Sequence, residues 1–239
     1  MTYNMNSTKQ RTKYFDIQAL PSITLPTENV NGKRHYVTPE GNRYPSVTTV
    51  LSSMSAQGIA EWRARVGNEE ANRVSTQASG RGTKVHQIAE DYLLNKDNYL
   101  EGHMPSNIET FNQIKRYLDD WCDEVYGNEI ALYSHDLKTA GRCDLVARIH
   151  GIRTIGDFKT SKKWKKEEWI QNYFFQCTAY ALMLYERHKV WCPQICLMIA
   201  TDEDGLQPIL KQTSQYVDEV RHFFDDWHVK NSLLTNVQN

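Results

Sequence analysis

Two aspartates and a lysine that stand close together in the sequence are the residues best suited to catalysis. They are Asp144, Asp157 and Lys159. If His150–Gly151 is a two-residue hairpin loop, Asp144 lies directly opposite Asp157, with the two Cβ atoms about 4.5–5.5 Å apart. Lys159 is two residues beyond Asp157, so it shares the same face of its strand. The spacing therefore predicts one polar site on a β-hairpin.

Two carboxylates at this separation predict a metal ion. They repel each other, and one of them would hold a proton unless a divalent cation lay between them. Ligand sets made of oxygen atoms favour Mg²⁺ or Mn²⁺. A lysine that is desolvated beside the charge of the metal has a lowered pKa and can accept a proton from water. These residue types suit metal-assisted hydrolysis of phosphodiesters.

A solvated sheet face with an ordinary salt bridge is the alternative explanation of the same residues. The spacing alone does not decide between the two. Apolar residues are expected on the opposite face of the strands, namely Cys143, Leu145 and Phe158. They favour the site, because the acidic face then does not belong to a wholly polar strand.

Alternating hydrophobicity after Gly127 predicts the strands that carry the site. The pattern changes there from the period of a helix to that of a strand, which indicates a three-stranded meander. Two more strands are expected near the C-terminus, separated by a tight turn at Asp202–Gly205. The strands are expected over residues 129–137, 142–149, 152–160 and 190–201, and up to Lys211.

Helices are predicted on both sides of these strands. The segment 55–95 has a helical composition interrupted by Gly80 and Gly82, which indicates two helices with a glycine junction. Pro105 and the capping box Ser106–Glu109 announce an amphipathic helix. Its apolar residues recur every three or four positions, at Ile108, Phe111, Ile114, Leu118, Trp121 and Val125. Further helices are expected over 165–188 and up to about His228.

The order of the expected elements predicts an α/β fold with a central mixed sheet flanked by helices. The added helices toward the N-terminus would form one wall of the site or an arch over it. Residues 1–44 are polar, contain three prolines and show little periodicity, so we expect an irregular arm. Residues 45–239 are expected to form a single domain, which opens with the short β-branched segment 45–50.

The composition excludes several classes of protein. The chain has 239 residues, and its 28 Lys and Arg against 29 Asp and Glu exclude a histone-like polybasic architecture. No stretch of about 18 apolar residues occurs, and the first 20 residues lack the apolar run of a signal peptide. We therefore expect no membrane partner and a cytoplasmic location. A GxxxxGK[ST] phosphate loop is absent, so no nucleoside triphosphate is expected as a ligand.

Six short motifs, taken together and in order, resemble the PD-(D/E)XK nucleases. The resemblance is to their RecB-type exonuclease branch, which has mitochondrial and phage members, and it covers about residues 45–180. It implies a restriction-endonuclease-like core and a DNA exonuclease that acts at ends, with single-stranded ends expected. The motifs are Pro45–Leu51, Gly82–Glu90, Glu129, Gly141–Asp144, Asp157–Thr160 and Gln176–Tyr180.

The resemblance also implies a role for individual residues. Asp144 and Asp157 would bind metal, the carbonyl of Phe158 is a further candidate ligand, and Lys159 would be the catalytic lysine. His86 matches a histidine that joins the metal shell from a preceding helix. Two ions, Mg²⁺ or Mn²⁺, would bracket the scissile phosphate. Asp157 stands where many members of the family have glutamate.

Two glutamates are candidates for supporting roles. His86 and Glu90 lie four residues apart and so share one face of a helix. Their Gly-Thr-x-x-His-x-x-x-Glu setting favours a functional histidine over an ordinary one. Glu90 is either a partner that positions His86 or part of a salt bridge at the rim of the core. Glu129 is a weaker candidate for orienting a water molecule at the metal.

Five scattered cysteines argue against a disulfide framework and indicate a reducing compartment. Some relatives in the branch carry an iron–sulfur cluster, but these cysteines do not flank the core, so none is expected. Cys192 and Cys196 form a poor zinc pattern in an apolar run, which favours burial. The cysteines are Cys122, Cys143, Cys177, Cys192 and Cys196.

Candidate DNA contacts follow the catalytic strand. Gln176 and Tyr180 match the helix motif that contacts DNA near the cut, although a purely structural tyrosine hydroxyl is an equal alternative. A basic run with one aromatic residue suits phosphate binding and base stacking. Residues 151–166 carry a net charge of +5 and residues 202–226 one of −5, so the acidic segment is expected to face away from DNA. The run is Lys162, Lys163, Trp164, Lys165 and Lys166.

Two rivals to an exonuclease remain open at the level of sequence. One is a structure-specific endonuclease that uses the same site. The other is a non-catalytic DNA-binding protein on a decayed nuclease fold, against which the joint presence of the two aspartates, the lysine and the histidine argues. A role in DNA replication, recombination or repair, in a bacterium or a phage-infected cell, fits either nuclease.

Overall fold

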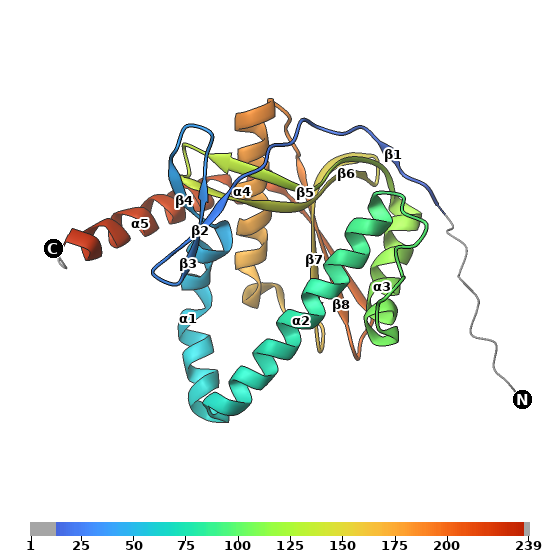
Figure 1. The fold of residues 1–239 in the computed structure, drawn as a ribbon, viewed down its shortest axis with the longest axis horizontal. Helices are drawn as coiled ribbons and strands as arrows, with labels where there is room; N and C mark the ends of the chain where they lie inside the picture. The colour runs from blue at the N-terminus through green and yellow to red at the C-terminus, as the bar shows by residue number, and fades with distance from the viewer. Residues whose placement is uncertain (1–12, 237–239) are drawn as a thin grey trace, which may run out of the picture.

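A six-stranded mixed sheet forms the centre of the protein, in the order β1-β5-β6-β7-β8-β9. The computed structural model describes residues 13–236. Helices lie on both faces of the sheet (Figure 1), which confirms the predicted α/β class. The strands are β1 (Asp16–Ile17), β5 (Cys122–Ser134), β6 (Thr139–Ile149), β7 (Ile152–Ser161), β8 (Gln194–Thr201) and β9 (Leu206–Gln212). The helices are α1 (Val47–Val66), α2 (Asn68–Leu93), α3 (Pro105–Trp121), α4 (Gln171–His188) and α5 (Val217–Asn236), with short 3₁₀ helices η1 (Glu167–Trp169) and η2 (Thr213–Gln215).

The predicted three-stranded meander consists of β5, β6 and β7, which pair antiparallel. Ile149 pairs with Ile152 across a two-residue loop. Both loop residues, His150 and Gly151, have positive φ, at 54° and 75°. This backbone matches a type I′ hairpin turn, whose twist suits the flanking strands. The predicted loop and the register that it sets are confirmed.

The pairing of β6 with β7 ends where the candidate site begins. The last paired residues are Leu145 and Gly156, so Asp144 and Asp157 lie just beyond the ladder. The alternation of side chains along β6 also changes here, because the strand beyond this point is paired on one side only and is free to twist. Leu145 packs beside α3, but Cys143 packs in the core beside α4. The expectation that these two share one face is wrong.

Two hydrophobic cores lie on opposite faces of the sheet. Phe158 of β7 packs with α2 and α3, whereas Ile155, three residues earlier on the same strand, packs with α1, α4 and α5. The first core includes Ile88, Phe111, Ile114 and Leu118. The second includes Val50, Phe175, Leu184, Val220 and Phe224. Among residues 13–236 no helix is both long and apolar enough to cross a membrane.

The junction between the first two helices lies at Gly67, not at the glycines expected to form it. Gly67 has a φ of 86°, which closes α1 and opens α2. Gly80 and Gly82 lie inside α2. A Cβ at position 82 would stand 3.9 Å from the hydroxyl oxygen of Thr160, an ordinary van der Waals distance, so α2 packs beside β7 here without requiring glycine. The segment 45–50 is helical from Val47 onward.

The third helix is shorter than predicted and starts differently. Met104 is its N-cap and Pro105 occupies the first turn, so Ser106 lies inside the helix and the predicted capping box does not form. The helix ends at Trp121, whose side chain is 49% exposed. Val125, expected on the apolar face, instead belongs to β5. The apolar period continued across the boundary because both elements face the same core.

The described part of the N-terminal segment is structured, contrary to the expected irregular arm. Strands β2 (Thr27–Val30), β3 (Lys33–Val37) and β4 (Arg43–Pro45) form a small antiparallel sheet, and β1 runs parallel to β5. An Asn31–Gly32 turn with positive φ at both residues joins β2 to β3. Residues 1–12 lie outside the described part. The division of the chain into an arm and one domain stays a prediction.

All five cysteines are buried free thiols. Burial raises the pKa of Cys122, Cys192 and Cys196 to about 12. Thiols with such pKa values are poor nucleophiles and poor metal ligands at neutral pH. The expected burial of Cys192 and Cys196 is confirmed.

Candidate functional site

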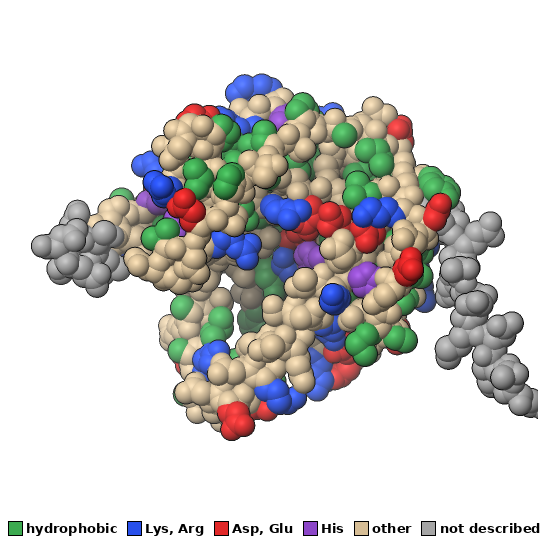
Figure 2. Space-filling view, in the orientation of Figure 1, with side chains coloured by type: hydrophobic (Ala, Val, Ile, Leu, Met, Phe, Trp, Pro, Cys, Tyr) green, Lys and Arg blue, Asp and Glu red, His purple; other side chains and the backbone are tan. Residues whose placement is uncertain are grey.

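A groove of about 570 Å³ contains most of the predicted site residues. It runs between α2 on one side and the small sheet, the start of α1 and one face of α4 on the other. In Figure 2 acidic side chains gather in the middle of this face, above α2, with basic side chains on either side. Among the residues that line the groove are His86, Glu90, Glu129, Asp144, Lys159, Gln176 and Tyr180.

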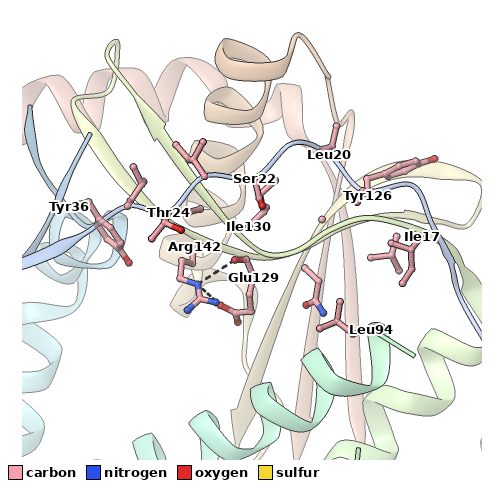
Figure 3. A pocket seen from close by; sticks show the side chains of 17 residues that line it. Ile17, Leu20, Ser22, Thr24, Tyr36, Leu94, Tyr126, Glu129, Ile130 and Arg142 are labelled. Carbon is pink, nitrogen blue, oxygen red and sulfur yellow. Dashed lines mark hydrogen bonds and ion pairs between the residues drawn. The ribbon is translucent and has the colours of Figure 1, made fainter. Parts of the chain in front are cut away.

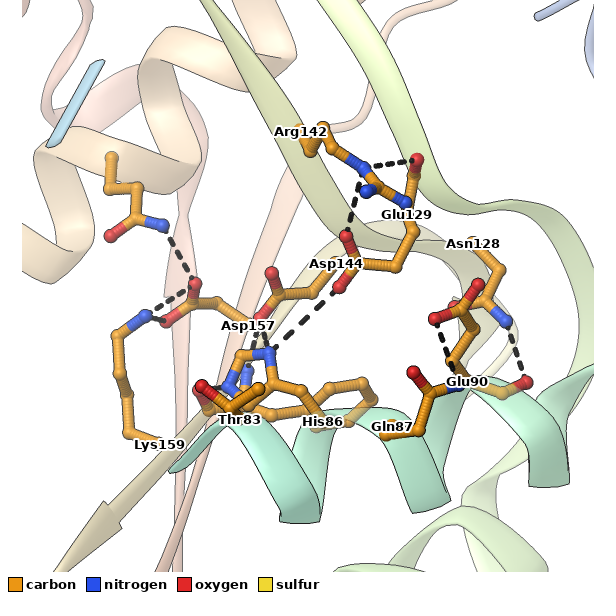
Figure 4. A network of polar contacts seen from close by, with 12 residues as sticks. Thr83, His86, Gln87, Glu90, Asn128, Glu129, Arg142, Asp144, Asp157 and Lys159 are labelled. Atoms are coloured by element: carbon orange, nitrogen blue, oxygen red, sulfur yellow. Dashed lines mark hydrogen bonds and ion pairs between the residues drawn. The ribbon is translucent and has the colours of Figure 1, made fainter. Parts of the chain in front are cut away.

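The helix α2 directs His86 toward Glu129 of β5 and Asp144 of β6 (Figure 4). The ring nitrogen Nε2 lies 2.7 Å from the carbonyl oxygen of Phe158. A carbonyl can only accept, so Nε2 carries the proton and donates. In the neutral ring Nδ1 then has a free lone pair, and it faces Asp144 Oδ2 at 3.5 Å and Glu129 Oε1 at 3.9 Å. This tautomer leaves Nδ1 available as a metal ligand.

The carbonyl of Phe158, predicted as a further metal ligand, is the acceptor of that histidine hydrogen bond. In this arrangement it orients the imidazole, as partners of metal-binding histidines commonly do. Burial lowers the pKa of His86, but the neighbouring carboxylates of Glu129 and Asp144 outweigh it, so the pKa is raised. A direct bond from the carbonyl to metal stays a prediction.

Three side chains meet at one point, and their donor atoms fit a divalent cation. The imidazole nitrogen of His86 and one oxygen each of Glu129 and Asp144 lie within 4.8 Å of one another. Neighbouring ligands of an octahedral ion with bonds of about 2.1 Å stand about 3 Å apart, so a small contraction would close the set. Two oxygens with one imidazole nitrogen suit Mn²⁺ and tolerate Mg²⁺.

The backbone explains why Glu129 belongs to this cluster. Asn128 pairs with Leu145 and Ile130 with Cys143, which leaves Glu129 across from Asp144 on the neighbouring strand. Glu129 has a φ of 50°, a strained conformation for a residue with a side chain. Such strain concentrates at functional sites. Glu129 was predicted only to orient water, but its carboxylate is one of the three clustered donors and lies 3.9 Å from Nδ1 of His86.

Asp144 is also tied to the adjacent strand. The backbone N–H of Phe158 donates to its Oδ2 at 2.9 Å, and the side chain is almost fully buried. This bond continues the contact between β6 and β7 past the end of their ladder. The hydrogen bond therefore fixes Oδ2 of Asp144 between β6 and β7, the two strands that carry the predicted metal ligands.

Asp157 lies outside the three-residue cluster and has other partners. Lys159 Nζ is 2.7 Å and 2.6 Å from its two oxygens, and Gln176 Nε2 donates to Oδ1 at 3.0 Å. The side chain is 2% exposed. Burial raises the pKa of Asp157 to about 6, with Lys159 opposing and Asp144 adding to the shift. The predicted neighbours are therefore adjacent, with Asp157 paired to the lysine.

The pKa of Lys159 shifts in the direction opposite to the expected one. Burial lowers it, but the carboxylates of Asp157 and Asp144 outweigh burial and raise the pKa. A lowered pKa was expected beside the charge of a metal ion, whereas the charge nearest to the lysine in the protein is the carboxylate of Asp157. Lys159 is accordingly an ammonium group, held in place by a hydrogen bond to Oδ1 and an ion pair with Oδ2 of one carboxylate.

Tyr180 packs against the strand that carries Asp144. It is buried, and burial raises the pKa of its hydroxyl well above the ordinary value. A Cβ at Gly141 would stand 2.6 Å from Oη of Tyr180 and 3.0 Å from its Cε1, so the ring requires glycine there. This close packing favours the structural alternative for Tyr180. Contacts of Tyr180 and Gln176 with DNA stay predictions.

We expect Gly141→Ala to destabilise the protein by about 1–3 kcal/mol, because the new methyl group overlaps the tyrosine ring. Urea denaturation would measure the change in the free energy of unfolding. Gly80→Ala is the matched control, since a methyl group at this position of α2 would meet no atom within 4 Å and alanine favours a helix. A Gly141→Ala protein as stable as the wild type would show that the two side chains are not in tight contact.

The basic run lies against the acidic turn that was expected to face away from DNA. Lys163 and Lys162 lie 3.0 Å and 3.6 Å from carboxylate oxygens of Glu203, and the N–H of Trp164 donates to Asp204. Parallel strands bring this about: β7 pairs with β8 up to Ser161 and Thr201, so the segments that follow both strands emerge side by side. Residues 202–204 therefore lie beside the basic run, and the side that faces DNA stays a prediction. Phosphate binding by Lys162, Lys163, Lys165 and Lys166 and stacking on Trp164 stay predictions.

Glu90 is half-buried at the edge of the groove and faces Glu129. Burial, and next the charge of Glu129, raise the pKa of Glu90. Its carboxylate lies near the amide of Gln87 at 3.5 Å. Among the described residues it has neither a hydrogen bond to His86 nor a salt bridge, so neither of its two predicted supporting roles is formed.

Several groove residues escaped sequence reasoning. Arg34 and Tyr36 come from the small sheet, and Ser46 and Thr48 come from the start of α1. Nothing in the sequence links Arg34 and Tyr36 to the catalytic strands, because the contact is tertiary, whereas Ser46 and Thr48 lie within the motif Pro45–Leu51. Arg142 had a signal, since it stands two residues before Asp144 within one of the recognised motifs. Its guanidinium lies 3.2 Å from the carboxylate of Glu129.

A second cavity, of about 480 Å³, shares the pair formed by Glu129 and Arg142 (Figure 3). The segment 17–25 crosses β5 and leaves this space between itself and the strand. Its walls are mostly apolar and include Leu20, Tyr126 and Ile130. The ion pair thus lies between a polar groove on one side and an apolar cavity on the other.

Comparisons with known proteins find similarity among solved structures. No model of a known protein family matches the sequence, and no curated protein matches it. A crystal structure of a protein from Eubacterium rectale named "Putative exonuclease" is similar over 66% of this chain and 69% of that one. The identity is 13% and the TM-score 0.46. A similarity of this degree carries no conclusion about activity.

Proposed function

We propose that this protein is a metal-dependent deoxyribonuclease of the PD-(D/E)XK type that hydrolyses phosphodiester bonds at DNA ends, with single-stranded ends as substrate. One observation carries the proposal: His86, Glu129 and Asp144 bring their donor atoms within 4.8 Å of one another in the groove that Lys159 also lines. The motifs in the sequence support the same chemistry independently of this geometry.

His86, Glu129 and Asp144 would hold Mg²⁺ or Mn²⁺. When bound, the ion supplies positive charge that stabilises the charge developing on the scissile phosphate. The second ion implied by the family would compete with Lys159 for Asp157. Lys159, aligned by Asp157, can donate hydrogen bonds to an anionic phosphate oxygen. Gln176 keeps Asp157 in position by donating a hydrogen bond from Nε2 to its Oδ1.

Two arginines at the groove can position the substrate. Arg34 is exposed and lines the groove from the small sheet, and Arg142 lines it from β6. Guanidinium groups bind phosphate oxygens in pairs, so both suit the phosphates that flank the scissile one. The acidic centre with basic sides seen in Figure 2 agrees with a metal site between phosphate contacts.

An end-labelled single-stranded oligonucleotide tests the proposal. We expect the wild type to shorten it stepwise with Mg²⁺ or Mn²⁺ and to leave it intact with EDTA. Asp157→Asn should be inactive, because the amide cannot hold Lys159 as an ion pair. A circular single strand should resist an enzyme that needs ends, whereas cleavage of the circle would indicate an endonuclease. Absence of any metal-dependent cleavage would reject a nuclease.

A further inference from the structure

A separate groove of about 430 Å³ lies between α1 and the start of α4. Its volume is within the range of small-ligand pockets, about 300–1,000 Å³. The helix α1 borders a hollow that it encloses with α2 and the body of the molecule, and hydrophobic side chains are visible inside it (Figure 2). The groove is lined by Met54, Ser55, Gly58, Ile59, Trp62, Glu168, Trp169, Gln171 and Asn172.

The same two helices line this groove and the candidate site. On α1, Thr48 lines the site, and Ser55 and Trp62 follow at intervals of seven residues, about two helical turns each, on the same face. On α4, Gln176 lines the site, and Asn172 precedes it by one turn. The groove therefore continues the site along the line between α1 and α4.

Lys159 and Tyr173 connect the two places more closely. The Nζ of Lys159 lies 5.1 Å from the centre of the Tyr173 ring, a cation–π contact. Tyr173 directly follows Asn172, which lines the groove. A strand that left the candidate site past Lys159 along α4 would thus reach the groove within about one helical turn.

Large apolar side chains in this groove are exposed to solvent. Trp169 is 64% exposed and Ile59 46%, and Trp62 is half-buried. Lys166 Nζ lies 5.1 Å from the centre of the Trp169 ring. Two tryptophans in one open groove, with an ammonium group over one of them, combine flat surfaces for stacking with positive charge for phosphates. Neither exposed side chain is needed there to fill a core.

We propose that Trp62 and Trp169 bind unpaired nucleobases of the strand whose phosphate lies at the candidate metal site. This inference rests on the proposed nuclease function and adds a place for the bases. Stacking requires a free face on the base, which a single strand offers and the interior of a duplex does not. Lys165 and Lys166 stand just before Trp169, with Glu167 and Glu168 between them, so phosphates between the bases have positive partners nearby.

Binding measured without cleavage tests this proposal. The probe is a fluorescein-labelled single-stranded oligothymidylate, followed by fluorescence anisotropy in EDTA. We expect Trp62→Ala and Trp169→Ala each to weaken binding about 5- to 100-fold, as removal of a stacking aromatic does. Trp62→Phe and Trp169→Phe should stay close to the wild type, because phenylalanine also stacks. Trp121→Ala is the control, since Trp121 is similarly exposed but stacks on His150 at the end of α3.

Abasic residues placed at successive positions of the probe give a second test. We expect an abasic residue to weaken binding of the wild type at one or two positions only, and Trp169→Ala to lose that sensitivity. The proposal would be overturned if Trp62→Ala and Trp169→Ala weakened binding of a blunt duplex as much as binding of the single strand. It would also be overturned if no position of the abasic residue changed the affinity of the wild type. Wild-type protein that shows the base dependence but no metal-dependent cleavage would instead reject the nuclease and keep the base-binding groove.

Discussion

Lys159→Ala should lower the rate of metal-dependent cleavage by about 10²–10⁴-fold and leave the affinity for single-stranded DNA nearly unchanged. The ammonium group is half-buried and paired to Asp157, and it lines the candidate site. Other basic residues can also bind the phosphates of DNA. Among residues 13–236, however, Lys159 is the only lysine that lines the groove. Its loss therefore removes a contact to the reacting phosphate and little of the binding surface. Gel-based cleavage and anisotropy on one oligonucleotide would measure both quantities.

The same substitution leaves a buried carboxylate without its cation, which must be separated from the catalytic effect. Removing one partner of a buried ion pair costs about 3–5 kcal/mol. The double variant Lys159→Ala, Asp157→Asn removes the unpaired charge and keeps an oxygen for Gln176 to donate to. We expect it to recover stability and to remain inactive. Lys230→Ala, on the exposed face of α5, is the control for loss of a lysine.

Retention of metal-dependent cleavage by both Lys159 variants would remove this residue from the chemistry. Loss of cleavage in the single variant with full recovery in the double variant would mean that Lys159 acts only by neutralising Asp157. The two results are distinct, and each contradicts the proposed role in a different way.

Mn²⁺ at about 100 times its dissociation constant should raise the melting temperature of the wild type by about 5–10 °C. At that ratio a ligand that binds only the folded state adds about 2.7 kcal/mol of stability. The rise should disappear in Asp144→Asn and in His86→Ala, because each removes one of the three clustered donors. EDTA should reverse the effect. Differential scanning fluorimetry measures it without any substrate.

Asp136→Asn is the control for this metal effect. Its carboxylate is exposed, lies in the turn between β5 and β6 and has a long contact to Arg221 at 3.9 Å. We expect it to keep the full rise in melting temperature. If Asp144→Asn kept the rise as well, the ion would bind elsewhere and the proposed metal site would be wrong.

The strands that carry the site could be predicted because their signals are local. The two-residue loop at His150–Gly151 fixes the register of β6 and β7, and an alternation of apolar and polar residues fixes their faces. Together these two signals are enough to place Asp144, Asp157 and Lys159 in one region. The alternation did not predict the face of Cys143, because the pairing of β6 with β7 ends at Leu145 and no longer controls the direction of the side chains beyond it.

Features that depend on distant contacts could not be predicted. Glycine occurs both at a helix junction and inside a helix, so the pattern could not tell Gly67, which ends α1, from Gly80 and Gly82, which lie inside α2. Glu129 joins the cluster because β5 pairs with β6 in one particular register. Arg34 reaches the groove from a small sheet whose polar strands have no hydrophobic period.

The parallel pairing of β7 with β8 affects how DNA binding would respond to salt. Nucleic-acid binding is opposed by salt in proportion to the number of counterions that the protein releases from the phosphates. Lys162 and Lys163 already have a carboxylate partner in Glu203, so a phosphate would have to displace it. An exchange of one anion for another gains less than contact with a free lysine. The ionic-strength dependence should thus be weaker than a count of lysines in the run suggests.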